Sequence, residues 1–139
     1  MAARAGRLRY LLDTDTVIYL VHRRSAAVAA RFARLRASEV AISCIGFGEL
    51  SYGAEKSMKR DAALAVLEAF SSRIAVLPID ASVSAEYGRI RALLEAKGKP
   101  LGNNDLWIAA HALSANLILV TNNVREFSRV PDLKLENWV

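Results

Sequence analysis

The sequence predicts a three-layer α/β/α fold, in which a central, mainly parallel sheet lies between two layers of helices. Short apolar runs alternate along the chain with longer segments whose apolar residues recur at helical spacing. Strands that alternate with helices are typical of parallel sheets, and such strands are apolar because both of their faces are buried. The chain has 139 residues, of which 53% are hydrophobic, so it is long enough for one domain with its own core.

The expected strands are the short apolar runs. The third of them ends at Pro78, which lacks the N–H that a central strand needs. These runs cover residues 8–12, 40–44, 74–77, 117–120 and 133–135, the last as an edge strand.

Helices are expected where apolar residues recur every three or four positions. In one of them Val83, Tyr87, Ile90 and Leu94 fall on one face, and the segment Lys-Gly-Lys-Pro at 97–100 ends the helix. The expected helices cover residues 17–21, 26–36, 46–57, 62–70, 82–96 and 104–114. All of residues 1–139 are expected to form a single domain, with its core at residues 9–138 and a disordered segment at residues 1–7.

Charge and cysteine content restrict the class of protein. Lysine and arginine number 19 against 14 acidic residues, and the net charge of +5 suits an anionic partner such as nucleic acid or an acidic protein segment. A single cysteine, Cys44, excludes an internal disulfide and a multi-cysteine zinc site. Asp13 and Asp15 interrupt the apolar stretch near the N-terminus, so we expect no signal peptide. No run reaches the roughly 18 apolar residues of a membrane span, so we expect a cytoplasmic protein with no membrane partner.

Several polar residues stand where the predicted topology brings them together. Asp13 follows the first strand, Glu49 follows the second by one helical turn, and Asp105 opens a helix. Asn123 and Glu126 follow the fourth strand. The carboxyl ends of parallel strands and the amino ends of the returning helices share one edge of the sheet, where α/β proteins place their sites.

Carboxylates that converge in this way repel one another unless they gain a counter-charge or bind protons. Mg²⁺ prefers oxygen ligands and takes one or two carboxylates together with waters and substrate phosphates. An acidic pocket on a basic protein therefore indicates metal-assisted hydrolysis of a phosphodiester.

The acidic residues also have structural alternatives. Asp13 and Asp105 could each cap the helix that follows, and we expect Asp15 to be the N-cap of the helical segment at 16–21. Glu49 lies among apolar residues with no basic partner within one helical turn, a costly setting for an unpaired carboxylate.

The remaining candidates also have two readings. Thr121 could end a strand or orient a water, and Glu126 could pair with Arg125 or Arg129. A cysteine nucleophile would need a positioned histidine, and the chain has only His22 and His111. We therefore expect Cys44 to be a small buried hydrophobe, His111 to be structural and Trp107 to belong to the core.

Four segments together carry a more specific signal. They read YLLDTDTVIYL at 10–20, ISCIGFGELSYGAEKS at 42–57, GNNDLWIAAHA at 102–112 and LILVTNNVREFSRV at 117–130. In this order and at this chain length they resemble the PIN-domain ribonucleases of the VapC toxin type.

The resemblance implies a PIN fold and a Mg²⁺- or Mn²⁺-dependent endoribonuclease, with tRNA as the family-level substrate. Asp13, Glu49 and Asp105 would be catalytic, with Asp13 and Asp105 as metal ligands and Glu49 in support. Family members often have aspartate where this chain has Asn123, so either Asn123 or Glu126 would be the fourth site residue.

The resemblance also implies supporting polar roles for Asp15 and Thr121. The protein would be the toxin of a type II toxin–antitoxin system. It would form a homodimer and bind a VapB-type antitoxin whose C-terminal arm lies in the active-site groove.

Two alternatives differ in class. The segment LLDTDTV at 11–17 also matches the nucleophile motif of haloacid-dehalogenase-like phosphatases, but that reading leaves Glu49 without a role. The other alternative is a catalytically inactive PIN domain that only binds RNA or a partner, which the substitution at Asn123 keeps open.

Overall fold

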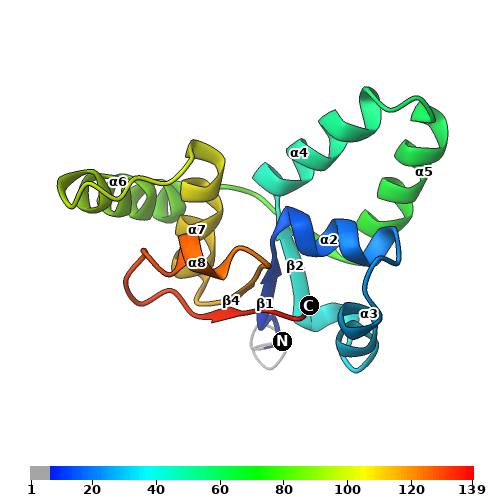
Figure 1. The fold of residues 1–139 in the computed structure, drawn as a ribbon, viewed down its shortest axis with the longest axis horizontal. Coiled ribbons are helices and arrows are strands. Elements are labelled where there is room, and N and C mark those ends of the chain that lie inside the picture. The colour runs from blue at the N-terminus through cyan, green and yellow to red at the C-terminus, as the bar shows by residue number, and fades with distance from the viewer. Residues whose placement is uncertain (1–6) are drawn as a thin grey trace.

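The computed structural model describes residues 7–139, and its centre is a five-stranded sheet (Figure 1). Every strand pair in it is parallel, in the order β3-β2-β1-β4-β5, which confirms the predicted sheet. The expectation of disorder at residues 1–7 falls, apart from Arg7, outside the described residues. The strands are β1 (Tyr10–Leu12), β2 (Val40–Ser43), β3 (Ala75–Leu77), β4 (Ile118–Val120) and β5 (Leu135–Glu136).

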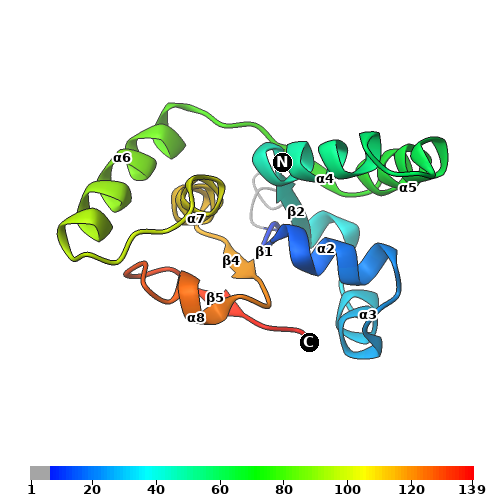
Figure 2. The ribbon, with the colours of Figure 1, turned by 45° about the horizontal axis from the view of Figure 1, so that its top comes forward.

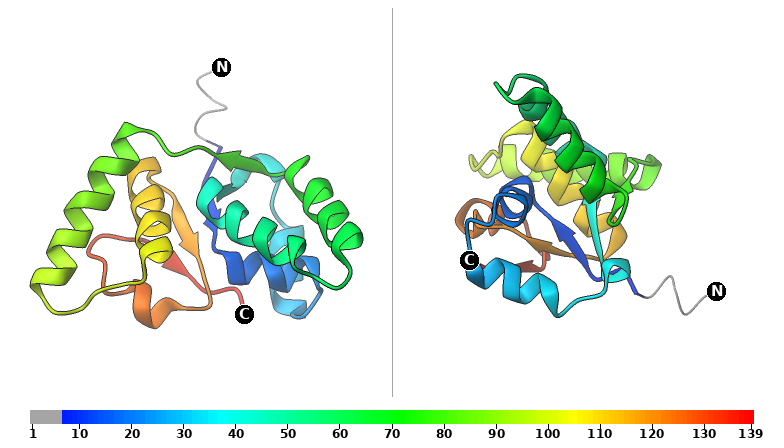
Figure 3. Two further views of the ribbon diagram at one scale, coloured as in Figure 1. Left: turned by 90° about the horizontal axis from the view of Figure 1, so that it is seen from above. Right: turned by 90° about the vertical axis from the view of Figure 1, so that its right-hand side faces the viewer.

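The helices connect these strands, and two helix pairs flank the sheet on opposite sides (Figure 3). One pair is α4 with α5 and the other is α6 with α7. The helices are α2 (Thr14–Val21), α3 (Ala26–Ala33), α4 (Cys44–Glu55), α5 (Arg60–Ser71), α6 (Ala81–Ala96), α7 (Asn103–Ala115) and α8 (Val124–Phe127), with a short 3₁₀ turn at Ala37–Glu39.

Several helix boundaries differ from the expected ones because of capping. Helix α2 begins at Thr14 rather than Val17, since the side chain of Asp13 accepts a hydrogen bond from the Thr14 N–H. Helix α4 begins at Cys44, which we expected to end a strand, because the Ser43 hydroxyl accepts from the Ile45 N–H. Helix α8 was not predicted, and its single turn is too short to show helical periodicity.

Helices lie on both faces of the sheet (Figure 2), and apolar side chains pack between the layers, as the three-layer prediction requires. Leu11 of β1 packs on one side with residues of α6 and α7. Its neighbours Tyr10 and Leu12 pack on the other side with residues of α2, α3, α4 and α5. Successive residues of a strand point to opposite faces, so this short central strand contributes to both halves of the core.

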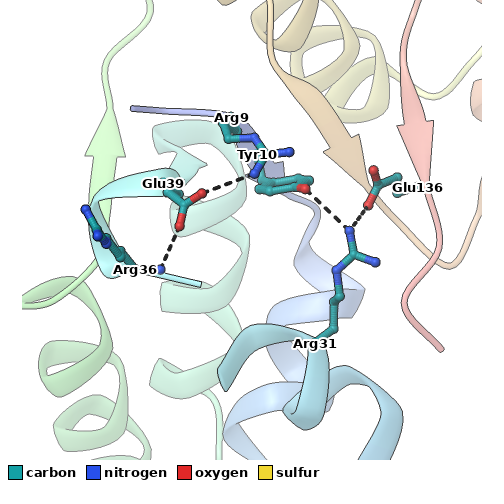
Figure 4. A network of polar contacts seen from close by, with 6 residues as sticks. All are labelled: Arg9, Tyr10, Arg31, Arg36, Glu39 and Glu136. Atoms are coloured by element: carbon teal, nitrogen blue, oxygen red, sulfur yellow. Dashed lines mark hydrogen bonds and ion pairs between the residues drawn. The ribbon is translucent and has the colours of Figure 1, made fainter. Parts of the chain in front are cut away.

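Polar and aromatic contacts hold the C-terminal segment against the first strand. Figure 4 shows the polar contacts among Tyr10, Arg31 and Glu136. The guanidinium of Arg31 on α3 donates to Glu136 Oε1 at 2.9 Å and to the Tyr10 hydroxyl at 3.4 Å. The indole of Trp138 donates to the same Glu136 oxygen at 3.0 Å and packs edge-on against the Tyr10 ring. The Glu136 carbonyl in turn accepts from the Thr121 N–H, so this network supports the end of β4.

Among the helices of residues 7–139, none combines the length and the apolar character that a bilayer crossing demands.

Candidate active site

Asp13 lies at the carboxyl edge of the sheet, where β1 and β4 end side by side. Its N–H donates to the Val120 carbonyl at 2.8 Å, and its Oδ2 accepts from the Thr121 hydroxyl at 2.8 Å. Its Oδ1 accepts from the Thr14 N–H at 2.9 Å, so Asp13 is the N-cap of α2 as well as a site candidate. Both carboxylate oxygens are thereby held in fixed directions.

The environment of Asp13 disfavours its charge. The residue is only 7% exposed, and burial raises the pKa of its carboxyl from 3.8 to about 7. The neighbouring charges of Asp15 and Asp105 also raise this pKa, against the lowering effect of the two hydrogen bonds. A buried carboxylate at this position therefore needs either a proton or a positive partner.

Asp15 does not cap the helix, contrary to our expectation. The helix begins two residues earlier than the predicted segment, which places Asp15 within the first turn of α2. Its Oδ2 instead accepts from the backbone N–H of Asn122 at 3.1 Å. Asp15 thus joins the start of α2 to the loop after β4, beside Asp13.

Glu49 points from α4 toward polar groups on two other helices. Its Oε1 accepts from the Thr14 hydroxyl at 2.8 Å, and its Oε2 accepts from the Asn104 side-chain amide at 3.2 Å. We inferred an apolar setting for this carboxylate, but the structure provides two neutral donors that orient it without cancelling its charge.

Asp105 occupies the third position of α7, whose N-cap is Gly102, so Asp105 does not cap its helix. Burial raises the pKa of the Asp105 carboxyl, and the charges of Glu49, Glu126 and Asp15 raise it further. A surface depression of about 390 Å³ is lined here by Glu49 and residues 102–105. Asp105 is therefore electrostatically coupled to acidic residues of α2, α4 and α8.

Either Asn123 or Glu126 is expected as the fourth residue of the site, and the two have different contacts. The N–H of Asn123 donates to the Thr121 hydroxyl at 2.9 Å, and this contact orients the hydroxyl that donates to Asp13. Glu126 lies close enough to raise the pKa of Asp105, and within residues 7–139 it forms no ion pair with Arg125 or Arg129. The alternative in which Glu126 pairs with one of these arginines is therefore not observed, and its charge acts on Asp105 instead.

The donor chemistry of this acidic cluster, defined as Asp13, Asp15, Glu49, Asp105 and Glu126, fits a hard divalent cation. All candidate ligands are oxygens, and no lysine or arginine of the described part of the chain forms an ion pair with any of them. With the side chains as they stand, no three His, Cys, Asp or Glu side chains of residues 7–139 group tightly enough to hold an ion alone. A divalent cation bound here would therefore need waters or substrate oxygens as further ligands.

Sequence reasoning missed three residues that position this cluster: Thr14, Asn104 and Asn122. Thr14 and Asn104 each stand next to a predicted acid, so adjacency was the available signal.

Cys44 and Trp107 are less buried than a core residue. Cys44 is half-buried at the start of α4. Trp107 is partly buried, packs against the core and stacks on Tyr87 at 3.8 Å between ring centroids.

Ser43 and His111 form a buried contact beneath the site. Ser43 Oγ lies 2.9 Å from His111 Nδ1 and also caps α4, so it joins the helices that carry Glu49 and Asp105. Burial lowers the pKa of His111, which agrees with the structural role that we expected.

We predict that Ser43→Ala lowers the free energy of unfolding by about 2 kcal/mol, since it leaves a buried imidazole nitrogen unpaired and removes a cap. Urea denaturation measures this loss. The control Ser71→Ala, at an exposed hydroxyl bonded to Glu68 O, should stay within about 0.5 kcal/mol of the wild type. Equal losses in the two variants would contradict a role for the buried contact.

The fold and the site agree with a family match. The sequence model of the PIN domain family matches residues 10–133 of this chain, so the chain belongs to the PIN domain family. The match spans Glu49, which the phosphatase alternative left without a role, and that alternative is therefore rejected.

Named relatives place the chain more narrowly. Ribonuclease VapC2 of Haemophilus influenzae is 47% identical over 132 residues, which cover 95% of this chain and 99% of that protein. A tRNA(fMet)-specific endonuclease VapC of Salmonella typhimurium is 44% identical and covers 94% and 98% of the two chains. Within the PIN family, this chain is a ribonuclease of the VapC type.

Solved structures agree with this placement. The DNA-bound VapBC of Salmonella typhimurium superposes with a TM-score of 0.90 at 43% identity, covering 95% of this chain and 99% of that chain. VapBC2 of Rickettsia felis, bound to a promoter DNA fragment, superposes with a TM-score of 0.88 at 40% identity, covering 95% and 100%.

Proposed function

We propose that this protein is the toxin of a type II toxin–antitoxin system and a Mg²⁺-dependent endoribonuclease that hydrolyses RNA phosphodiester bonds at the acidic cluster. The observation that carries the proposal is the set of coupled carboxylates at one sheet edge, which raise the pKa values of Asp13 and Asp105 and form no ion pair with a lysine or arginine of residues 7–139. Such a site favours a divalent cation, and with it a phosphate, over protons.

The metal ligands in this proposal are Asp13 and Asp105, with Glu49 and Glu126 in support. When bound, Mg²⁺ supplies the positive charge that polarises the scissile phosphate. Thr121 and the Thr14 N–H hold the two oxygens of Asp13, which keeps that carboxylate oriented. Thr14 and Asn104 hold Glu49, which then accepts the proton of the attacking water as general base.

Chelation tests the metal requirement. Wild-type protein treated with EDTA should leave a folded RNA intact, and added Mg²⁺ or Mn²⁺ should restore cleavage. Cleavage that survives EDTA would overturn the metal-dependent mechanism, and the relative rates with the two ions would identify the preferred one.

We propose tRNA as the substrate class. The relatives from Salmonella typhimurium and Shigella flexneri, 44% and 46% identical, are tRNA(fMet)-specific endonucleases. Digestion of total tRNA, followed by sequencing of the new 5′ ends, would identify the substrate. Equal cleavage of unstructured RNA would argue against a tRNA-directed enzyme.

We propose that a homodimer of this chain assembles with a VapB-type antitoxin in the cytoplasm. The related chains of known structure occur in VapBC complexes. In this proposal the C-terminal arm of the antitoxin binds in a groove of about 660 Å³ that adjoins the acidic cluster. The groove is lined by Cys44, Glu49, Tyr52, Lys56 and Asn104, among others. Light scattering of the toxin alone and of the co-expressed pair would establish both assemblies.

Two variants would decide whether Glu126 or Asn123 is the fourth residue of the site. We predict that Glu126→Gln lowers cleavage by about 10- to 100-fold, the range for groups that support metal ligands, because Glu126 contributes charge next to Asp105. We expect Asn123→Ala to lower cleavage by less than about threefold, since the contact to Thr121 uses its backbone N–H. The reverse order of effects, measured as initial rates, would assign the position to Asn123.

A further inference from the structure

The sheet edge opposite the acidic cluster is basic. Because all strands are parallel, the residues that precede them lie together at the amino edge. Arg9 precedes β1, Arg36 precedes the turn into β2, Arg73 precedes β3 and Lys134 precedes β5. The acids therefore follow the strands and these basic residues precede them, which separates the charges across the sheet.

Three of the arginines at or near this edge line a cleft of about 350 Å³ with one acid, Glu39. Glu39 is engaged, since it accepts from Arg9 Nη1 at 3.2 Å and from the Arg36 N–H at 2.9 Å (Figure 4). Arg9 also lies over the Tyr10 ring, 5.0 Å from its centroid. Arg9 and Glu39 thus form a fixed, neutralised base of the cleft.

The other two arginines of the cleft, Arg7 and Arg36, keep their charge available. Both are exposed, and within residues 7–139 neither guanidinium donates to an acidic side chain. A guanidinium presents a planar fork of donors that matches the oxygens of a phosphate. The cleft therefore has a net positive charge and the donor geometry for a phosphate group.

The extent of the basic edge fits a polymer better than a single ion. Neighbouring strands are about 4.8 Å apart, so a five-stranded edge flanked by Arg73 and Lys134 extends for about 20 Å. Strands of three or four residues separate it from the acidic cluster by roughly 10 to 13 Å, more than the Debye length of about 8 Å at physiological salt. The acids on the other edge therefore weaken the field of the basic residues only in part.

We propose that this basic edge, centred on Arg7 and Arg36, is a second RNA-binding site that holds the phosphate backbone of a folded substrate away from the point of cleavage. The inference rests on the proposed ribonuclease function. The large apolar side chains exposed in the described residues, Tyr52, Met58, Val66 and Val139, lie outside the residues that form this edge, so the edge offers charge and no apolar anchor for a peptide. The recognition is thus by charge, which suits a nucleic-acid backbone.

The test compares two double variants that each remove two positive charges. Arg7→Gln/Arg36→Gln alters the cleft, and Lys59→Gln/Arg60→Gln alters the exposed start of α5, where Lys59 is the N-cap and Arg60 the first residue. Binding of a folded tRNA and of a short single-stranded oligoribonucleotide is measured by fluorescence anisotropy in the Asp13→Asn background, which prevents cleavage. Initial rates are measured with both RNAs in the otherwise wild-type background.

We expect the cleft variant to bind the tRNA about tenfold more weakly, with a slope of log K against log salt that is less steep by about 2, one for each lost phosphate contact. KM for the tRNA should rise with kcat nearly unchanged, and the oligoribonucleotide should be bound and cleaved as by the wild type. The Lys59→Gln/Arg60→Gln control should stay within threefold throughout.

Equal tRNA binding and equal salt slopes in the two double variants would overturn the proposal, as would a matching loss on the short RNA. A cleft variant that loses affinity for purified antitoxin but not for tRNA would overturn it in favour of a protein partner. If the wild type cleaves no RNA with any metal, the ribonuclease proposal fails, while the binding comparison still decides whether the edge holds RNA.

Discussion

Replacing Asp13 with asparagine should lower kcat/KM for RNA cleavage by about 1,000-fold, which corresponds to about 4 kcal/mol of transition-state stabilisation. The Asp13 carboxylate is the most buried acid of the cluster. Its negative charge is stabilised only by hydrogen bonds from two neutral groups, the Thr14 N–H and the Thr121 hydroxyl. Asparagine preserves the shape, since its carbonyl can accept from the Thr14 N–H and its amide can donate to Thr121. The loss would therefore report the missing charge rather than a lost cap.

The matched control is Asp61→Asn, the same chemical change at a fully exposed carboxylate next to Arg60. We expect this control to cleave as the wild type does, and to arrest growth equally when expressed without antitoxin. An Asp13→Asn protein that cleaves normally would remove Asp13 from the site. A wild type that binds RNA but never cleaves it would support the inactive PIN alternative.

The second large effect is on stability and depends on pH and metal. The pKa of Asp13 is about 7 in the folded protein against 3.8 for the free group, so the folded state retains a proton that the unfolded state releases. Stability of the chelated protein should therefore fall as pH rises between these values, by about 2 kcal/mol from pH 5.5 to pH 7.5 for this residue. The penalty levels off only above about pH 8, where the folded-state carboxyl is also ionised.

A divalent cation should reverse this loss, because it replaces the proton as the partner of the carboxylate. At 100 times its dissociation constant, Mg²⁺ would add about 2.7 kcal/mol to the unfolding free energy. Urea denaturation at pH 5.5 and pH 7.5, with EDTA or Mg²⁺, measures both effects. In Asp13→Asn both should be strongly reduced; an identical pH dependence in the variant and the wild type would show that Asp13 is not the responsible group.

The sheet and the grouping of the acids could be predicted because they follow from local patterns. An apolar run followed directly by Asp13, or by Thr121, indicates a buried strand and a polar group at its carboxyl end. Parallel topology then places these groups on one edge without any knowledge of side-chain positions. For this reason the predicted set contains every acid of the cluster.

Contacts between elements could not be predicted in the same way. The hydrogen bond from Thr14 to Glu49 joins residues 35 positions apart and depends on how closely α2 passes α4. The capping role expected for Asp15 was wrong because Asp13, two residues earlier, is the N-cap of α2. Short elements such as α8 depend on tertiary packing, which no periodicity reveals.

The contact between Asp13 and Thr121, which spans 108 positions, has a consequence for how activity is acquired. Strand β4 lies between β1 and β5, so the central pairing of the sheet closes only after a loop of most of the chain has formed. The acids that follow β1 and lie on α4 can therefore be synthesised and even locally folded without forming a nuclease. The capacity to cut RNA should appear together with the cooperative folding of the whole domain, and a partly unfolded or truncated chain should be harmless to the cell that makes it.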